Sequence, residues 1–359
     1  MRILIATDAW RPQVNGVVRS LEALARSLRQ QGVDIDFLTP LDFRSFPLPG
    51  YREISLALAW PGIVRRRIEC GYDHIHIATE GPIGQVVRAI CLRDGVCFTT
   101  SFHTLFPEYI QARCGLPPAI GYAALKRFHN AGAGTMVSTP SLARHLDGRG
   151  FRRLLRWSRG VDHTLFSPKK AAPLDLPRPI FLYAGRVSVE KNLEAFLRLD
   201  LPGSKVIVGD GPATPKLKAL FPQAHFPGVK TAEELAPLYA AADVFVFPSR
   251  TDTFGMVLLE ALACGLPIAA YPVMGPLDVI GASGAGALDE DLRIAALAAL
   301  DISRDCARAR ALTFNWDACA RQFLDNVAYA HGAITLGAVG VEPWLTRVEL
   351  PGRRRSAPT

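Results

Sequence analysis

Several common sequence patterns are missing from this 359-residue chain. No apolar run is long enough to cross a bilayer, so we expect no membrane-spanning helix. No small-residue cleavage site follows a long apolar region near Met1, so we expect no secretory signal peptide. The seven cysteines are scattered without Cys-x-x-Cys spacing, and Cys91, Cys97 and Cys264 lie in apolar surroundings. This pattern indicates reduced core cysteines in a cytoplasmic protein.

Other absences narrow the function. The dinucleotide fingerprint Gly-x-Gly-x-x-Gly does not occur, which argues against hydride chemistry with a nicotinamide cofactor. His74 and His76 alternate on one expected strand without a third ligand at suitable spacing, so we interpret them as structural and predict no bound metal. The arginine clusters at 65–67, 152–156 and 353–355 lack zinc-finger or RNA-binding signatures and interleaved aromatics, so we predict no nucleic-acid partner.

The chain carries an excess of positive charge. Lys and Arg total 41 against 33 Asp and Glu, a net charge of +8. This balance favours anionic partners such as nucleotides or phospholipid surfaces, although each cluster can also be an ordinary solvated face.

Short apolar runs alternate with helical patterns along the chain. Expected strands are 3–6, 35–39, 74–78, 96–101, 135–138, 154–157, 180–184, 205–208, 244–248 and 268–271. Expected helices are 17–30, 83–93, 119–130, 141–146, 193–199, 232–241, 255–264 and 289–300. Nearly continuous apolar strands separated by helices predict two Rossmann-like α/β domains, each a doubly wound parallel sheet, that face a cleft.

The length and the proline distribution give the domain boundaries. Four prolines crowd the segment 166–178 and its border, which is typical of a linker. We therefore predict an N-terminal domain over 1–165 and a C-terminal domain over 179–314. A last helix over 315–331 and an irregular tail over 332–359 complete the chain, with 351–359 disordered.

The most informative run places Asp252 and Glu260 eight residues apart. Glu260 lies among leucines and alanines in the expected helix 255–264, and no Lys or Arg lies three or four residues away. A carboxylate in so apolar a helix is costly unless it is hydrogen-bonded. Adjacent ribose hydroxyls would satisfy both oxygens, and a neighbouring backbone group is the alternative. Asp252 precedes the helix, where phosphates and polar sugars bind; a simple N-cap at Asp252 or Thr253 is the alternative.

Three further loops follow expected strands in the two halves. Asn15 and Gly16 open a helix whose first N–H groups can bind an anion, or form an ordinary βα turn. Arg186 and Lys191 flank a loop entering a helix and suit a diphosphate leaving group, or are surface cations near Glu190. The glycines of the run Gly209-Asp210-Gly211 can admit a base or ribose, or make a plain turn.

Two residues at strand ends of the first half complete the candidates. His103 can contact a sugar hydroxyl or steady a positive reaction centre, or be a core or cap histidine. Glu80 can bind an acceptor or cap the helix that follows it.

Together these residues resemble glycosyltransferase family 4, the retaining nucleotide-sugar transferases of GT-B fold, from Ile3 to about Tyr329. The resemblance rests on Asn15-Gly16, on Gly-Arg-x-x-x-x-Lys-Asn from 185 to 192, on Val-Gly-Asp-Gly-Pro from 208 to 212, and on an acid-x7-Glu motif. Asp252 stands where the family has Glu, which is a departure at the donor sugar. Residues 75–84 look like the branch of GDP-mannose-dependent α-mannosyltransferases and sulfoquinovosyl- or glucuronosyl-diacylglycerol synthases.

The resemblance implies a role for each candidate. Glu260 would bind the ribose; Arg186 and Lys191 would bind the diphosphate; Asp252 and the backbone of Phe254, Gly255 and Met256 would hold the donor sugar and β-phosphate. Asn15, Gly16 and the 209–211 loop would also contact the donor, His103 would lie near the donor sugar, and Glu80 near the acceptor. The resemblance implies no metal or other cofactor, an acceptor-binding N-terminal domain, and a last helix that crosses back onto it.

The function expected is transfer of a hexose, mannose or a glucose-type or uronic sugar, from a nucleotide diphosphate sugar to a lipid or glycan. The run 56–67 sets apolar residues and Trp60 beside three arginines, which suits an anionic membrane surface. We therefore predict a cytoplasmic enzyme at the inner face of the cytoplasmic membrane, making a membrane glycolipid. Alternatives are a GT-B epimerase or phosphorylase, and a non-catalytic nucleotide-sugar-binding module.

Overall fold

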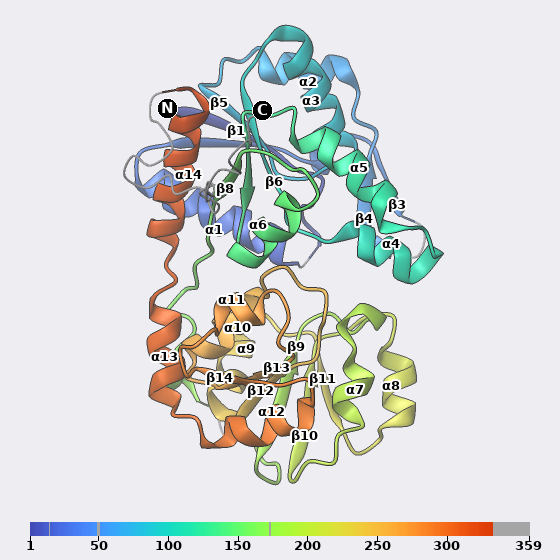
Figure 1. Cartoon of the computed structure of the whole chain (residues 1–359), viewed down its shortest axis with the longest axis vertical. Helices are drawn as coiled ribbons and strands as arrows, with labels where there is room; N and C mark the ends of the chain where they lie inside the picture. The colour runs from blue at the N-terminus through green and yellow to red at the C-terminus, as the bar shows by residue number, and fades with distance from the viewer. Residues whose placement is uncertain (14, 49–50, 172–173, 333–359) are drawn as a thin grey trace, which may run out of the picture.

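The structure, a computed structural model, describes residues 1–13, 15–48, 51–171 and 174–332. These residues form two domains, one above the other in Figure 1, each built on a six-stranded parallel sheet. A two-stranded antiparallel hairpin, β3 (Ser45–Leu48) and β4 (Tyr51–Ala57), is added to the first domain. The predicted disorder of 351–359 lies outside the described residues.

The first sheet has the strand order β2-β1-β5-β6-β7-β8. Its strands are β1 (Arg2–Ala6), β2 (Asp34–Leu38), β5 (His74–Ile77), β6 (Phe98–Ser101), β7 (Gly134–Val137) and β8 (Leu154–Arg156). The strand order changes direction between β1 and β5, the two strands paired through Ile3 and His74. In parallel α/β sheets, ligands bind beyond the carboxyl ends of the strands at such a point.

Helices cover both faces of the first sheet. They are α1 (Gly16–Gln30), α2 (Pro61–Ile68), α3 (Pro82–Asp94), α4 (Phe106–Cys114), α5 (Pro118–His129), α6 (Pro140–Asp147) and α14 (Trp316–Ala330). Helices α1 and α14 pack on one face, where Leu24 and Phe323 meet Ile5. Helices α2 and α3 pack on the other, where Val64 and Val87 share a core.

Part of the interior of the first sheet is polar, beside the apolar cores that contain Ile5 and Val87. His74 and His76 on β5 and Thr99 and Ser101 on β6 are all buried, with at most 1% of each residue exposed. Hydrogen bonds satisfy them: the Thr99 hydroxyl lies 2.8 Å from His74 Nε2 and 2.9 Å from His76 Nδ1. Burial lowers the pKa of His76 well below the ordinary histidine range, so its ring is neutral.

The second sheet has the strand order β11-β10-β9-β12-β13-β14. Its strands are β9 (Ile180–Ala184), β10 (Ser204–Val208), β11 (His225–Gly228), β12 (Val244–Phe247), β13 (Ile268–Ala270) and β14 (Gly286–Leu288). Every residue of β9, β12 and β13 is buried, because helices cover both faces. Here the strand order changes direction between β9 and β12.

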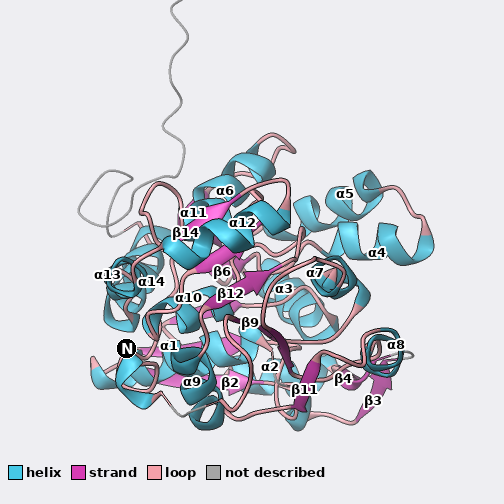
Figure 2. Ribbon diagram, turned by 90° about the horizontal axis from the view of Figure 1, so that it is seen from below, coloured by secondary structure: helices cyan, strands magenta, loops and turns pink. Residues whose placement is uncertain are grey.

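The helices of the second domain lie on both faces of its sheet (Figure 2). They are α7 (Leu193–Leu197), α8 (Thr214–Leu220), α9 (Ala232–Ala241), α10 (Met256–Ala263), α11 (Pro276–Val279), α12 (Leu292–Ala298) and α13 (Arg304–Leu312). Helices α9, α10 and α13 share one core, in which Tyr239, Leu262 and Ala307 are buried. Helices α7 and α12 share the other, which contains Phe196 and Ala295.

The chain passes between the domains twice, at neighbouring places. Val161 N donates to Phe314 O, so the two passages are hydrogen-bonded. A Cβ on Gly160 would come within 2.5 Å of Trp316 N, and only glycine permits this close approach. Helix α14 then packs against α1 and the first sheet rather than against the domain that precedes it.

The main strands and helices agree with the prediction, but smaller elements were missed. The hairpin β3–β4, the short strands β11 and β14, and helices such as α4 and α13 have weak local patterns. Strand β11 contains Pro227 and Gly228, residues that favour turns. The cysteines whose side chains are described, at 70, 91, 97, 264, 306 and 319, are free. No helix in the described part of the chain is long and apolar enough to span a membrane.

Candidate active site

Glu260 lies in the middle of α10 and is only 4% exposed. Arg19 Nη1 of the first domain donates to its Oε1 at 3.1 Å, and the Tyr239 hydroxyl donates to its Oε2 at 3.3 Å. The partners of this carboxylate in the structure are therefore two protein side chains, and not the neighbouring backbone group that was the alternative to a ribose. The partner was missed because Arg19 is 241 residues away in the sequence. The same contact shows that Glu260 points across the boundary between the domains.

Burial dominates the electrostatics of Glu260. It raises the pKa of the carboxyl above the usual glutamate value, and the hydrogen bonds and charge of Arg19 and Tyr239 offset this only in part. Burial therefore disfavours the charged form of Glu260. The cation next to it, Arg19, has a side chain that is 33% exposed. Such a pair can exchange partners when a ligand with hydroxyl groups enters.

The N-terminus of α10 is open to an anion. Its N-cap is Gly255, in the left-handed region at φ +82°, and no side-chain cap is formed there. The alternative interpretation of Asp252 or Thr253 as an N-cap is therefore wrong. Phe254 is buried and packs against Phe314, with ring centroids 6.1 Å apart. The first N–H groups of an uncapped helix attract phosphate.

Asp252 is paired with Lys191 instead. Lys191 Nζ lies 2.7 Å from Asp252 Oδ1 and 2.8 Å from Oδ2, in the loops that follow β12 and β9. Burial lowers the pKa of Lys191, but Asp252 and the hydroxyls of Tyr109 and Tyr183 outweigh burial and raise it overall. The lysine is therefore fully charged at the point where the strand order of the second sheet changes direction.

Arg186 follows β9 in the same loop as Lys191. It is half-buried, and burial lowers the pKa of its guanidinium while the nearby Glu190 raises it. Two buried hydroxyls of these loops, Ser188 Oγ and Ser249 Oγ, have no hydrogen-bond partner among the described residues. Buried polar groups without partners are rare in proteins. Here Ser188 lies in the loop that carries Arg186 and Lys191, and Ser249 in the loop that carries Asp252. Sequence patterns had not singled out either serine.

The glycines at 209 and 211 are explained by close contacts between two loops, whereas the sequence pattern indicated a base or ribose, or a plain turn. A Cβ on Gly209 would come within 2.0 Å of Gly185 O, and one on Gly211 within 2.3 Å of Val187 O. The two loops are joined by backbone hydrogen bonds, including Val187 N to Asp210 O at 2.9 Å. These glycines therefore let one loop pack on the other, and no ligand is needed to explain them.

Asn15 and Gly16 lie at the start of α1, where this helix approaches α10. The Asn15 side chain accepts from the N–H groups of Val17 and Val18, both at 3.0 Å, and so caps α1. A Cβ on Gly16 would lie 3.5 Å from the Met256 side chain, so α1 and α10 begin side by side. Asn15 therefore has the role expected in an ordinary βα turn. The absence of a side chain on Gly16 leaves space between α1 and α10.

His103 lies in the loop after β6, and both of its ring nitrogens have protein partners. Arg159 Nη2 donates to Nδ1 at 3.1 Å, so Nε2 carries the proton and donates to Ser101 Oγ at 2.9 Å. The backbone carbonyl of His103 accepts from Thr253 Oγ1 of the second domain at 2.7 Å. A direct sugar contact from the ring would need one of these bonds to break, whereas its backbone already faces the other domain.

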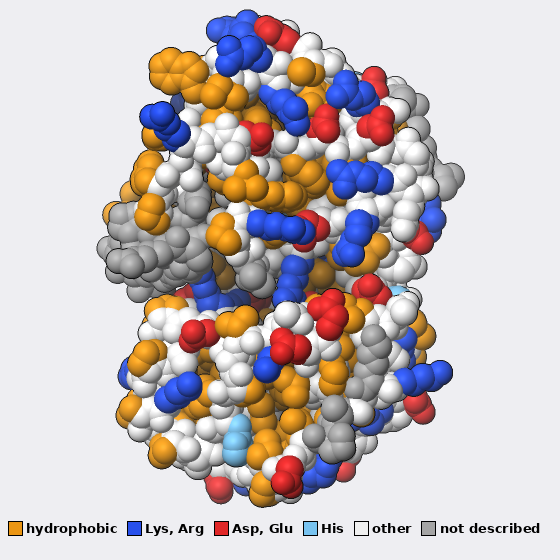
Figure 3. Space-filling view, turned by 180° about the vertical axis from the view of Figure 1, so that it is seen from behind, with side chains coloured by type: hydrophobic (Ala, Val, Ile, Leu, Met, Phe, Trp, Pro, Cys, Tyr) orange, Lys and Arg blue, Asp and Glu red, His pale blue; other side chains and the backbone are white. Residues whose placement is uncertain are grey.

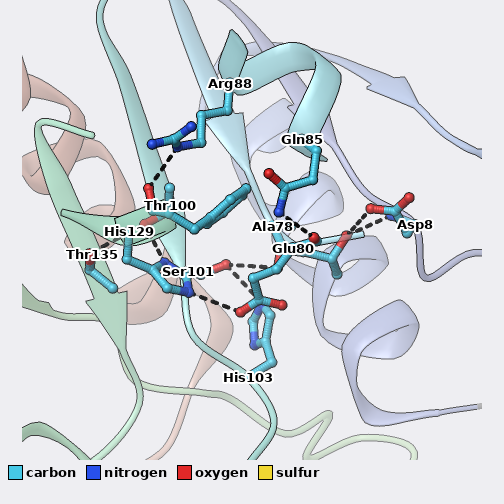
Figure 4. A network of polar contacts seen from close by, with 12 residues as sticks. Asp8, Ala78, Glu80, Gln85, Arg88, Thr100, Ser101, His103, His129 and Thr135 are labelled. Carbon is cyan, nitrogen blue, oxygen red and sulfur yellow. Dashed lines mark hydrogen bonds and ion pairs between the residues drawn. The ribbon is translucent and has the colours of Figure 1, made fainter. Parts of the chain in front are cut away.

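Glu80 lies in the loop after β5, beside the polar interior of the first sheet (Figure 4). Its carboxylate accepts from His129 Nε2 at 3.0 Å, and His129 Nδ1 lies 2.8 Å from the Thr100 hydroxyl. It does not cap α3, because Asp8 accepts from Ile83 N at 2.8 Å at the start of that helix. The alternative role of Glu80 as a helix cap is therefore wrong, and Asp8 was missed.

The site residues thus gather at the facing edges of the two sheets. Figure 3 shows the surface narrowed between the domains, with basic side chains along the narrow zone. On the second domain are Arg186, Lys191, Asp252 and Glu260; on the first are Arg19 and the backbone of the loop at His103. The exposed carboxylate of Asp210 accepts from Gly211 N in its own turn, and the backbone carbonyl of Asp210 accepts from Val187 N in the loop that carries Arg186.

Comparison with known families agrees with this arrangement. Residues 14–165 match the family described as Glycosyltransferase Family 4, and residues 178–303 match Glycosyl transferases group 1. A sulfoquinovosyl transferase of Arabidopsis thaliana is 30% identical over 300 residues, covering 74% of this chain and 58% of the plant protein's length. A GDP-mannose-dependent alpha-mannosyltransferase of Mycobacterium tuberculosis is 29% identical over 312 residues, covering 78% of this chain and 81% of that protein.

Solved structures with the same fold are more distant in sequence. Sucrose-phosphate synthase from Thermosynechococcus elongatus aligns with a TM-score of 0.73 and 21% identity over 93% of this chain and all of that one. An Anabaena protein solved with UDP and glucose aligns with a TM-score of 0.68 and 16% identity, over 91% of this chain and 99% of that one. These likenesses confirm the predicted GT-B fold.

Proposed function

Since the chain belongs to glycosyltransferase family 4, we propose that it transfers a hexose from a nucleotide diphosphate sugar to a lipid or glycan, with retention of anomeric configuration. The observation that carries the proposal is Glu260, a buried carboxylate in α10 that pairs with Arg19 of the other domain. The names of the relatives, a GDP-mannose-dependent mannosyltransferase and a sulfoquinovosyl transferase, support mannose or a glucose-type sugar.

The donor would bind mainly to the second domain. Glu260 would accept hydrogen bonds from the two ribose hydroxyls after Arg19 moves toward solvent. Lys191, Arg186 and the first turn of α10 would bind the diphosphate, since each supplies positive charge or N–H groups. Asp252 would then be free to contact the donor sugar once phosphate competes for Lys191.

The transfer step needs charge stabilisation at the leaving group more than a protein nucleophile. The acceptor hydroxyl oxygen would bond to the anomeric carbon on the face from which the β-phosphate oxygen departs. The hydroxyl proton would pass to that phosphate oxygen, which becomes the base. Asp252 and Glu260 are each paired with a cation, which suits binding rather than nucleophilic attack. Lys191 and Arg186 neutralise the leaving diphosphate, so the proposal invokes no metal at this step.

A lipid acceptor would bring the first domain to an anionic membrane. Trp60 is 71% exposed and Leu58 is 59% exposed, beside a hollow lined also by Leu41, Phe43 and Ile63. Arg66 is exposed on the adjoining helix α2, whereas Arg65 pairs with Asp94. Apolar side chains with nearby cations favour the interface of an anionic bilayer.

A donor panel tests the enzymatic proposal. We expect one of GDP-mannose, UDP-glucose or a UDP-uronic sugar to raise the melting temperature and to label a lipid or glycan acceptor, with retained configuration in the product. Glu260→Gln should lose the shift, whereas Glu290→Gln, an exposed acid of the same domain, should keep it. Conversion of a donor to its epimer without acceptor, or binding without any transfer, would contradict the proposal.

The membrane proposal has a separate test. Co-sedimentation with vesicles containing an anionic phospholipid should fall when Leu58 and Trp60 are both changed to Ser. The control Ile294→Ser removes an exposed apolar side chain, 53% exposed, from the second domain and should leave binding unchanged. Binding that is indifferent to salt and to lipid charge would overturn this part.

A further inference from the structure

Three side chains that commonly bind metal ions meet at the edge of the first sheet opposite the candidate active site. His74 is the first residue of β5, and Cys97 immediately precedes β6, so both lie where strands begin. His331 follows the last turn of α14, which ends at the same edge, far from the second domain (Figure 1). The helix thus brings a third group to two that the sheet already holds together.

The ligand atoms are close enough to share one ion. His74 Nδ1 lies 3.0 Å from His331 Nε2, and these atoms and Cys97 Sγ all lie within 4.8 Å of one another. A tetrahedral zinc ion with bonds of about 2.0 Å to nitrogen and 2.3 Å to sulfur needs ligand atoms roughly 3.3 to 3.7 Å apart. The observed separations differ from these values by roughly 1 Å at most.

The surroundings of the cluster also suit a cation. His74 Nε2 lies 2.8 Å from the Thr99 hydroxyl, the kind of outer hydrogen bond that orients a metal-binding imidazole. The Cys97 thiol donates to Ala330 O, one of the last carbonyls of α14, at 3.3 Å; a metal ion would replace the thiol proton at this helix end, where the dipole favours positive charge.

The hydrogen bonds inside the sheet permit the required proton arrangement. With a metal on Nδ1, His74 carries its proton on Nε2 and donates to Thr99, which donates to His76 Nδ1. His76 Nε2 then donates to Ser101 Oγ, 3.1 Å away. Ser101 can accept this bond because its own hydroxyl has the carbonyl of Ala78 as an acceptor at 3.4 Å. Each donor therefore retains an acceptor.

We propose that His74 Nδ1, Cys97 Sγ and His331 Nε2 form a binding site for a zinc-class divalent ion that fastens the end of α14 to the first sheet. The ion displaces the thiol proton of Cys97 to solvent as the sulfur–metal bond forms. Three protein ligands leave a fourth position for water. The site is separate from the donor site and independent of the proposed transfer reaction.

Zinc titration of the chelator-treated full chain tests the proposal. We expect one zinc ion per chain by calorimetry, and with Co²⁺ a thiolate-to-cobalt charge-transfer band. Cys97→Ser should abolish that band, and Cys97→Ser or His331→Ala should weaken zinc binding by about 100-fold or more, because even outer-shell changes cost roughly 10- to 100-fold. His331 is exposed at a helix end, so His331→Ala should fold normally.

Matched variants exclude adventitious binding. Cys70→Ser and His225→Ala remove an exposed thiol and an exposed imidazole elsewhere and should leave affinity unchanged. Zinc should raise the melting temperature of the wild type and of both controls, but not of His331→Ala. Absence of stoichiometric binding, or equal affinity in the Cys97→Ser, His331→Ala double variant, would overturn the site.

Discussion

The two domains use similar parallel sheets but fill them differently. The first sheet contains hydrogen-bonded histidines and hydroxyls, such as His76 and Thr99, whereas strands β9 and β12 of the second are lined by residues such as Phe181, Leu182 and Phe245. The second domain has its charges at the strand ends, where Lys191 meets Asp252. The second domain thus carries its charged strand ends on an apolar sheet, whereas in the first domain hydrogen bonds run from the interior of the sheet, through Ser101, to the loop at His103.

The strand orders explain where each set of groups lies. In the second sheet the order changes direction between β9 and β12, and the loops after these strands carry Arg186, Lys191 and Asp252. In the first it changes direction between β1 and β5, and the loops after them lead to Asn15 and Glu80. Crevices form at such points, so the strand order determines where the candidate site lies, and the side chains determine its chemistry.

The largest expected effect tests the charged edge of the second domain. Lys191→Ala should lower the rate of transfer at saturating donor roughly 100- to 1,000-fold, as when a preorganised donor to developing charge is removed. Single-turnover kinetics measures this directly. Lys216→Ala removes a lysine from the exposed surface of the same domain and should change the rate less than about twofold. A loss below tenfold for Lys191→Ala would remove the leaving-group role.

The contribution of the polar interior of the first sheet to stability can be tested by replacing a polar residue there with an apolar one, and by making the reverse replacement in the second sheet. Thr99→Val preserves shape but leaves His74 Nε2 and His76 Nδ1 without their shared hydroxyl. The free energy of unfolding should fall by about 2–3 kcal/mol in chemical denaturation. The reverse change, Val246→Thr in β12, should cost about 1–3 kcal/mol because the new hydroxyl has no partner. A neutral Thr99→Val would show that the polar network contributes little.

Glu260→Gln separates binding from stability. Loss of charged hydrogen bonds to ribose should raise the donor KM about tenfold to thirtyfold. Burial raises the folded-state pKa of Glu260, so the fold binds its proton more tightly than the unfolded chain does. Glu260 therefore costs stability above that pKa, and Gln should not lower the melting temperature at neutral pH. A destabilised variant with normal KM would indicate a purely structural acid.

The same raised pKa predicts a pH dependence. As pH falls through the folded-state pKa of Glu260, the carboxylate gains a proton and loses its capacity to accept both ribose hydroxyls. Donor affinity should therefore weaken at a higher pH than for an ordinary glutamate. Calorimetry across the acidic range measures this, and the Glu260→Gln protein should show a flatter profile.

The smallest effect concerns the contact between the domains. Arg19→Gln removes the positive charge paired with the buried Glu260 and keeps an amide that can donate a hydrogen bond to it. If Arg19 competes with ribose for Glu260, donor affinity should stay equal or rise up to about threefold. Arg11→Gln, at an exposed pair with Glu22, is the matched control. A large loss of affinity would mean that Arg19 itself binds the donor.

The sequence predicted the main architecture because the apolar runs of both sheets are nearly continuous. It also placed Arg186, Lys191 and Asp252 in loops that follow strands, as they do after β9 and β12. Local patterns could not give the partners of these residues, since they come from distant segments. Arg19 meets Glu260 across 241 positions, and Arg159 meets His103 across 56.

Glycines show a second limit of sequence reasoning. Gly209 permits a close approach, as expected, but the group that approaches is the backbone of Gly185 rather than a ligand. A glycine that admits a ligand and a glycine that admits a neighbouring backbone look the same in the sequence, because either can stand at the end of a strand. Short elements were missed for a related reason: the hairpin β3–β4 and strand β14 are defined by pairing with other segments rather than by their own composition.

The most direct test of the central claim is a crystal structure of the chain with its nucleoside diphosphate. The account predicts both ribose hydroxyls within hydrogen-bond distance of the Glu260 carboxylate, with Arg19 displaced. The diphosphate should lie against Lys191, Arg186 and the first turn of α10. A nucleotide bound elsewhere, with Glu260 still bonded to Arg19 and Tyr239, would contradict the account.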